Sequence, residues 1–109
     1  MKTSDIEKAL KEIGLPFKYH HFKTSEAVVP PFICYIFPRS NNFDADGKVY
    51  EKISAIDIEL YTDEKDIEIE SKIEAVLDKY GFVYEKNEIW IQSEELFEVV
   101  YEMEGINNE

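Results

Sequence analysis

Residues 48–62 read KVYEKISAIDIELYT, and this extended stretch decides the fold. Val49 and Ile53 fall in one phase of the apolar alternation, whereas the apolar residues from Ile56 onward fall in the other. This change of phase predicts a β-bulge near residues 54–55. An extended chain of this length spans roughly 50 Å at about 3.3 Å per residue. Because a compact domain of 109 residues needs no strand of that length, part of the predicted hairpin is expected to project.

Upstream of this stretch lie a turn-rich loop, RSNNFDADG at residues 39–47, and an apolar run, FICYIF at residues 32–37. The run is apolar on both alternating faces, which is typical of a strand in the middle of a sheet. Pro38 ends the run. Further upstream, the aromatic residues 17–22, FKYHHF, suit an extended segment.

Two segments show helical periodicity. The first begins at Ser4, and Ser4 together with Glu7 matches a capping box. The second follows Asp63 and Asp66, either of which is a possible N-cap, and runs to Tyr80 with its apolar residues on one side. A glycine follows each segment and is expected to end the helix.

After the second helix, short strands are predicted at residues 82–84 and 89–91 around a turn at 86–87, followed by a longer strand at 96–103. Residues 105–109, GINNE, are expected to fray. The order helix, strands, helix, strands, with hairpins in place of repeated βαβ crossovers, predicts an antiparallel sheet with two helices on one face. We expect a single α+β domain over all 109 residues, with a long β-hairpin.

Charge is the most prominent feature of the composition. The chain has 24 acidic and 12 basic residues, which give a formal net charge of −12 at pH 7. Nucleic-acid binders normally present a basic patch, because neutralising phosphates supplies most of their affinity. Lys48, Lys52 and Lys65 each stand among carboxylates instead. The composition therefore argues against nucleic-acid binding.

Cys34 is the single cysteine, so an internal disulfide is excluded, and its place in an apolar run predicts a small core residue. The N-terminus lacks the apolar stretch of a signal peptide, and no segment approaches the roughly 20 apolar residues of a membrane span. We expect a cytosolic protein that does not bind membranes.

The sequence contains two patterns that resemble metal sites. His20 and His21 are adjacent, but neighbours in an extended segment point to opposite sides, so we do not expect them to chelate one ion. Asn42, Asp44 and Asp46 imitate the start of an EF-hand loop, but the twelfth position holds an isoleucine instead of the bidentate glutamate. We interpret the loop as a turn, with a weak cation site at these three residues as the alternative.

No pattern indicates an enzyme. Close carboxylate pairs such as Asp57 with Glu59, or Glu94 with Glu95, arise by chance among so many acids. No nucleophile, glycine-rich phosphate loop or triad pattern stands near them. We therefore predict no catalytic residue and no cofactor.

Aromatic residues are numerous, and several fall at the ends of elements or in loops. Such residues are enriched in protein interfaces, although they also cover small cores from outside. The sequence leaves both interpretations open for this group: Phe17, Tyr19, Phe22, Phe37 and Phe43.

Three stretches together resemble a known family. They are ADG with Val49 and Tyr50; IELYTDEKD at 58–66 with Glu68, Glu70 and Ile73; and Trp90-Ile91 with Ser93-Glu94 before Leu96-Phe97. From about residue 31 to residue 103 the chain is similar to small tail completion proteins, also called tail terminators or head-tail joining proteins. These are encoded in the head-to-tail joining region of long-tailed phages and prophages of Gram-positive bacteria.

The resemblance implies a curved antiparallel sheet with two helices, assembled as a six-membered ring on the tail tube. The partners it implies are further copies of the chain, the tail tube protein and the head-completion or connector protein, with DNA only passing through the lumen. It implies no enzymatic activity. The expected location is the virion tail, after assembly in the host bacterial cytoplasm.

A ring needs a heterologous interface, in which one patch meets a different patch on the next copy. The predicted hairpin and the loop before it supply one candidate patch, consisting of Phe37, Arg39, Phe43, Asp46, Val49, Tyr50 and Lys52. An acidic lining would repel the phosphates of passing DNA. Because six copies would carry a formal charge of about −72, we expect salt or divalent cations to strengthen assembly.

Two other functions remain open. One is a different component of the same particle, such as a head-closure protein. The other is a small acidic inhibitor that imitates DNA, which the net charge permits.

Overall fold

The computed structural model describes residues 2–26, 28–45 and 47–107. In chain order its elements are α1 (Asp5–Ile13), β1 (Phe17–Tyr19), the 3-10 turn η1 (Thr24–Glu26), β2 (Phe32–Ile36), β3 (Phe43–Ala45), β4 (Lys48–Glu51), β5 (Ile53–Thr62), α2 (Ile67–Lys79), β6 (Glu85–Ile91) and β7 (Leu96–Ile106).

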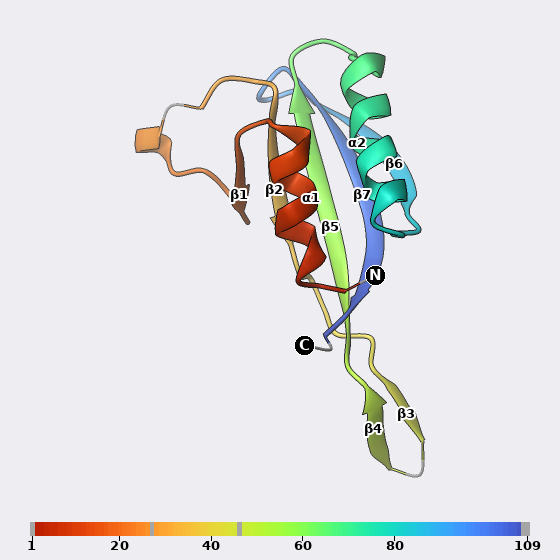
Figure 1. The fold of residues 1–109 in the computed structure, drawn as a ribbon. Coiled ribbons are helices and arrows are strands. Elements are labelled where there is room, and N and C mark those ends of the chain that lie inside the picture. Colours follow the sequence, from red (N-terminus) through yellow and green to blue (C-terminus); the bar gives the residue numbers. More distant parts are fainter. Residues whose placement is uncertain (1, 27, 46, 108–109) are drawn as a thin grey trace.

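Five strands form one sheet in the order β1-β2-β5-β7-β6, and β3 pairs with β4 in a separate two-stranded sheet. Helices α1 and α2 lie side by side across one face of the five-stranded sheet (Figure 1). This arrangement confirms the predicted α+β fold with two helices on one face. The sheet is mixed, however, because β1 runs parallel to β2 while the other neighbours are antiparallel.

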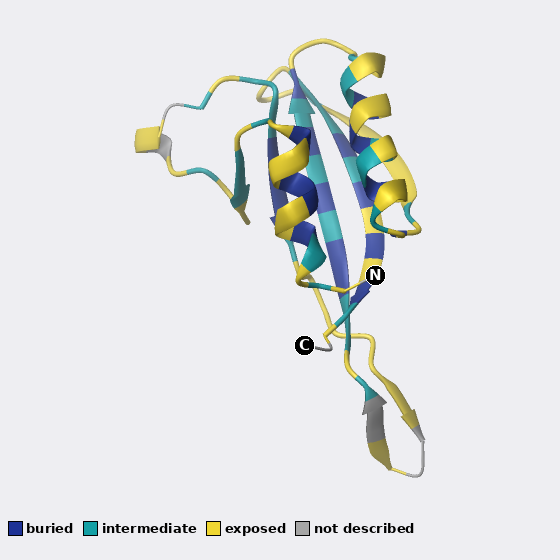
Figure 2. Ribbon diagram, viewed as in Figure 1, coloured by how far each residue is buried: buried dark blue, intermediate teal, exposed yellow. Residues whose placement is uncertain are grey.

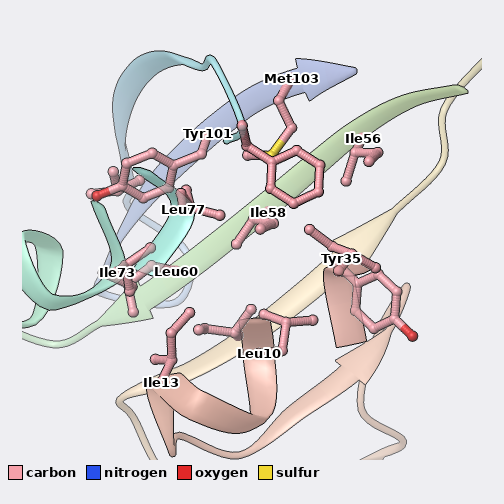
Figure 3. Packing of buried hydrophobic residues seen from close by; sticks show 14 residues of the cluster. Leu10, Ile13, Tyr35, Ile56, Ile58, Leu60, Ile73, Leu77, Tyr101 and Met103 are labelled. Atoms are coloured by element: carbon pink, nitrogen blue, oxygen red, sulfur yellow. The ribbon is translucent and has the colours of Figure 1, made fainter. Parts of the chain in front are cut away.

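The core fills the space between the two helices and the sheet. Alternate residues of β5, namely Ile56, Ile58 and Leu60, are fully buried against apolar residues of both helices (Figure 3). The predicted periodicity of both helices is confirmed, since each buries one apolar stripe. Burying a side chain of this kind contributes roughly 1.5–3 kcal/mol.

The helix starts differ in how they are capped. At α2 the Asp66 carboxylate accepts a hydrogen bond from the Ile69 backbone N–H at 3.0 Å, as expected of an N-cap. At α1 the capping-box prediction is wrong, because Ser4 has helical backbone angles and its side chain makes no capping hydrogen bond. A serine hydroxyl reaches the early amides only from an extended backbone, which Ser4 does not have.

One prediction for the C-terminal third is also wrong, and another is wrong for residues 105–106, whereas residues 108–109 lie outside the described residues. The expected turn at residues 86–87 is absent from the described chain, because β6 runs without interruption from Glu85 to Ile91 against β7. The tail is not frayed at its start, because β7 continues to Ile106, where Thr3 donates a backbone hydrogen bond to Ile106 at 3.0 Å. The first residues of the chain thus hold the end of the last strand in place.

The change of phase in the long extended stretch has a different cause from the predicted bulge. The register between β5 and β7 is continuous from Ile53 to Thr62, so no bulge lies at residues 54–55. Instead the extended stretch breaks at Lys52, where β4 ends and β5 begins. Residues before the break belong to a hairpin that leaves the body, and residues after it belong to the main sheet (Figure 1).

Candidate functional site

The most distinctive feature of the molecule is the hairpin that projects from one end of the sheet. We call residues 38–52, which contain β3 and β4, the arm. The arm extends away from both helices and from the main sheet (Figures 1 and 2), and the molecule measures 48 × 27 × 23 Å. The part of the chain that folds into the compact body therefore excludes β3 and β4.

The base of the arm is tied to β5 by backbone and side-chain hydrogen bonds. The Ala55 N–H donates to the Arg39 carbonyl at 2.9 Å, and the Asn41 N–H donates to the Ile53 carbonyl at 2.8 Å. The Asn42 side-chain oxygen accepts from the Ile53 N–H at 3.0 Å. The direction of the arm is thus fixed where it leaves the sheet.

The arm differs from the rest of the chain in charge. It contains three basic and three acidic residues and is formally neutral, so the remaining residues carry the whole net charge of −12. Its exposed residues include an apolar one, Phe43, which is 61% exposed. A neutral arm with an exposed aromatic side chain is suited to contact with another protein surface.

The second feature is the face of the sheet that the helices leave uncovered, which we call the open face. Because side chains alternate along a strand, the neighbours of the buried β5 residues point to this face. On β5 they are Asp57, Glu59 and Tyr61; on β7 the register places Glu98, Glu102 and Glu104 beside them.

The carboxylates of the open face stand opposite one another. Asp57 on β5 pairs with Glu102 on β7, and Glu102 pairs in turn with Glu85 on β6. Like charges directly opposite on neighbouring strands destabilise a sheet by roughly 0.2–1 kcal/mol. These three residues, together with Arg39 and Glu104, line a cavity of about 430 Å³.

Two carboxylates of the open face, Asp57 and Glu59, have raised pKa values. Burial raises the pKa of Asp57, and Glu102 raises it further, while Arg39 opposes the shift. Burial also raises the pKa of Glu59, with Glu98 adding to the effect. The Tyr61 hydroxyl lies 2.7 Å from a Glu98 oxygen and 3.1 Å from a Glu59 oxygen. Burial and these two carboxylates raise the pKa of Tyr61 far above its usual range, so Tyr61 stays a hydrogen-bond donor.

The edge of the sheet formed by β1 and β2 has an aromatic cluster. Tyr19 packs edge-on against Tyr35 with ring centroids 5.2 Å apart, and its ring lies 5.5 Å from that of Phe37. Two other aromatic residues were left open between an interface and a core-covering role. Phe17 packs against the core, and Phe22 packs against the ring of Phe32 on β2.

The prediction that the two histidines point apart is wrong. His20 has a left-handed backbone with φ of 68°, and the Nδ1 atoms of His20 and His21 lie 2.8 Å apart. The turn after β1 therefore brings the rings together, whereas a continued strand would separate them. Both line a cavity of about 340 Å³ beside Cys34. Within the described residues, however, no group of three or more histidine, cysteine or acidic side chains is arranged to hold a metal ion.

The structure places the sequence-predicted interface residues in and beside the arm. Arg39 and Lys52 are exposed at its base, Phe43 is exposed on β3, and Phe37 packs beside Tyr19. Val49 and Tyr50 lie on β4, but their side chains are outside the described part of the structure, as is Asp46 altogether. Of the proposed cation ligands, Asn42 uses its oxygen for the Ile53 N–H.

The core interpretation of Cys34 is confirmed, because Cys34 is buried and burial raises the pKa of its thiol to about 11. A thiol in this state is a poor nucleophile. No helix among the described residues is long and apolar enough to cross a membrane.

Sequence reasoning missed the acidic open face as a unit. The alternation of Asp57 and Glu59 with buried isoleucines placed them on the solvent side, but the alignment of β5 with β7 was needed to bring them beside Glu102. Neither family models nor curated proteins gave a match to this sequence when compared with it.

Proposed function

We propose that this protein is a structural component of a phage tail: a tail completion protein that assembles as a ring on the tail tube and joins the tail to the head. The observation that supports this most strongly is the combination of a projecting, neutral arm with an acidic open face on the same plate-like body. The acidic open face is unsuited to holding the phosphates of a nucleic acid.

The structure of the arm supports a role in assembly, because few contacts within its own chain stabilise it. A two-stranded hairpin without a third strand or a packed face is marginally stable in water. The β3–β4 pair receives neither from its own chain among the described residues, and Phe43 is left exposed. Contact with a neighbouring subunit supplies the missing packing.

The open face supports a role next to DNA that passes without binding. In a ring whose helices face outward, the open faces line the lumen, and their carboxylates repel the phosphates of the genome. A lining with lysine or arginine would retain DNA instead. The acids of β5 and β7 give this surface a negative potential at neutral pH.

The test is assembly with and without the arm. We expect the wild-type chain to sediment as a hexamer at high concentration with magnesium present, and a variant with residues 43–51 replaced by two glycines to remain a monomer. Unchanged circular dichroism and melting temperature verify that the variant keeps its body. A wild-type chain that stays monomeric at all concentrations and magnesium levels contradicts the proposal. Co-sedimentation with tail tubes, as opposed to the head connector, separates a tail completion protein from a head-closure protein.

One observation favours a second candidate, an acidic inhibitor that imitates DNA. Several acids share the open face, and Asp57, Glu102 and Glu85 lie in one line across three strands. Such an inhibitor acts as a small discrete species and needs no ring. A hexamer that includes the arm in its contacts excludes this candidate.

A further inference from the structure

The charges of this chain are distributed unequally between the two edges of the sheet. Residues 13–43 contain three basic residues and one acidic residue, whereas residues 44–109 contain six basic and twenty acidic residues. The first range supplies β1 and β2, and the second supplies β5, β7 and β6. Because the sheet order is β1-β2-β5-β7-β6, the less acidic range forms one edge and the strongly acidic range forms the other.

We define the basic edge as β1 with the turn after it, comprising Lys18, Tyr19, His20, His21 and Lys23. Glu26 forms an ion pair with Lys18 at 2.6 Å and accepts a hydrogen bond from the Lys23 backbone N–H at 2.7 Å, so one acid lies against this edge, although residues 17–23 themselves include none. Tyr19 is 47% exposed, and both histidines and Lys23 are exposed. This edge therefore offers an aromatic ring surrounded by donors and cations.

We define the acidic edge as β6, with Glu85, Glu88, Ile89 and Trp90. Ile89 is 51% exposed and Trp90 is 44% exposed, although Trp90 also packs on Phe97. Together β6 and its neighbour β7 carry five glutamates and a single lysine. This edge therefore offers large apolar side chains surrounded by carboxylates.

Strands β1 and β6 are the outermost strands of the sheet, and each pairs with one described neighbour. The outward N–H and C=O groups of an edge strand are a template for pairing with another chain. On the three-residue β1 the Tyr19 carbonyl already accepts a hydrogen bond from the His21 N–H at 2.9 Å, so β1 offers fewer groups for such pairing than the seven-residue β6.

We infer that the β1 edge of one copy docks against the β6 edge of a second copy, head to tail, through complementary charge and edge pairing. The occupant of each edge is thus a second copy of this chain. The two patches differ and lie at opposite sides of the sheet, so the contact is heterologous and its repetition gives a ring if the rotation closes. The inference rests on the proposed function, since it specifies a second contact of the proposed ring, in addition to the contact made by the arm.

Complementary charge also opposes the wrong contacts. Two acidic edges facing each other would bring their glutamates together, and like-charge juxtaposition at an interface is costly. The net charge of −12 repels separated copies, but this repulsion acts over distance and is screened by salt, whereas the edge contacts act at short range. The edge asymmetry therefore selects the head-to-tail orientation.

Charge reversal and rescue test the inference. The set Lys18→Glu with Lys23→Glu reverses the basic edge, and the set Glu85→Lys with Glu88→Lys reverses the acidic edge without touching its apolar side chains. We expect each set alone to weaken association by at least about tenfold. A chain with both sets should associate again, because the two reversed edges are complementary. The matched control is Lys11→Glu on the exposed side of α1, which should leave association unchanged.

Cross-linking gives a second measurement, which detects the contact directly and does not depend on weakening association. A chain with Lys23→Cys and Glu85→Cys, treated with a short bifunctional thiol reagent, should give a ladder of multimers. Either cysteine alone should give no ladder, and Cys34, which lines the same cavity as Lys23, is replaced by serine in every chain tested. Dimers from Glu85→Cys alone would show a symmetric β6 contact and overturn the inference.

The outcomes separate the two proposals. If the wild-type chain forms a hexamer, neither charge set weakens association and cross-linking gives no ladder, then the edge contact is overturned but the proposed ring remains. A ladder that grows without closing at six supports the edge contact and contradicts the closed ring. Absence of both hexamer and ladder overturns both.

Discussion

The Lys86 ammonium lies 2.7 Å from a carboxylate oxygen of Glu70, and this contact links the edge strand β6 to helix α2. Glu70 also pairs with Lys65 at 2.8 Å and is only 3% exposed. Burial raises the pKa of Glu70, but hydrogen bonds from Lys65 and Lys86 outweigh burial and hold it below its usual value. Glu70 is therefore a buried charge with two cationic partners.

We expect Glu70→Ala to lower the free energy of unfolding by about 1–3 kcal/mol, because it removes a buried carboxylate that accepts charge-assisted hydrogen bonds and leaves a cavity in its place. Urea denaturation at pH 7 measures the change. The matched control is Lys8→Ala, which removes an exposed pair with Asp5 and should change stability by no more than about 0.5 kcal/mol. The penalty of Glu70→Ala should shrink below pH 4.5, since a depressed pKa contributes stability that is lost as pH falls through the folded-state value.

At Asp57, by contrast, we expect removal of the charge to raise the free energy of unfolding. Its pKa is raised in the folded state by burial and by Glu102, so the folded protein binds this proton more tightly than the unfolded chain does. Asp57→Asn should therefore stabilise the isolated subunit at pH 7 by about 0.2–1 kcal/mol. The gain should be complete above the folded-state pKa and disappear below about pH 4, the unfolded-state value. A variant less stable than wild type at pH 7 would show that Asp57 makes favourable contacts that outweigh the repulsion.

At Gly105, strand β7 lies too close to the N-terminal segment to accommodate a side chain. A Cβ atom there would meet Ile56 Cδ1 and Thr3 Oγ1 at 2.8 Å and Thr3 Cα at 3.1 Å. Gly105→Ala should destabilise the protein by about 1–3 kcal/mol through overpacking. Gly47→Ala is a poor control because its φ is 74°, so Lys11→Ala on the exposed side of α1 serves instead. An unchanged melting temperature for Gly105→Ala would mean that Thr3 moves aside freely.

Association should depend on salt in two stages. Between about 0.01 M and 0.15 M the Debye length falls from roughly 30 Å to 8 Å, which screens repulsion between whole subunits. Association should therefore strengthen over this range and weaken at about 1 M, where contacts between the edges are screened as well. Sedimentation at five salt concentrations measures the profile. A monotonic weakening from the lowest salt concentration would contradict a dominant role for the net charge.

The elements with strong periodicity were predictable from the sequence. The residues FICYIF read as an internal strand because both of their faces are apolar, and β2 indeed lies between β1 and β5. The projecting hairpin followed from chain length, because residues 48–62 are too long for one compact strand. Apolar periodicity records burial, so it reports the parts of the fold that burial determines.

The errors concern features that pairing and turn geometry determine. Lys86 and Asn87 looked like a turn because both are polar, but in β6 Lys86 faces Glu70 and Glu74, and Asn87 bonds to Glu102. The two histidine rings meet because one residue, His20, has a left-handed backbone. A single left-handed residue leaves no periodic pattern in the sequence from which it could be predicted. The acidic open face depends on register, and register between distant strands is not written in local periodicity.

Strand β7 comes after every other described strand in the sequence and yet lies between β5 and β6 in the sheet. A nascent chain in which β7 is still inside the ribosome therefore lacks the strand that joins β5 to β6, and the hydrogen bond from the Thr3 N–H to the Ile106 carbonyl cannot form. Contacts between residues so distant in sequence are slow to form, because the entropy of closing the intervening loop opposes them. The sheet is therefore complete only after β7 has emerged, although β2 and β5 can pair earlier.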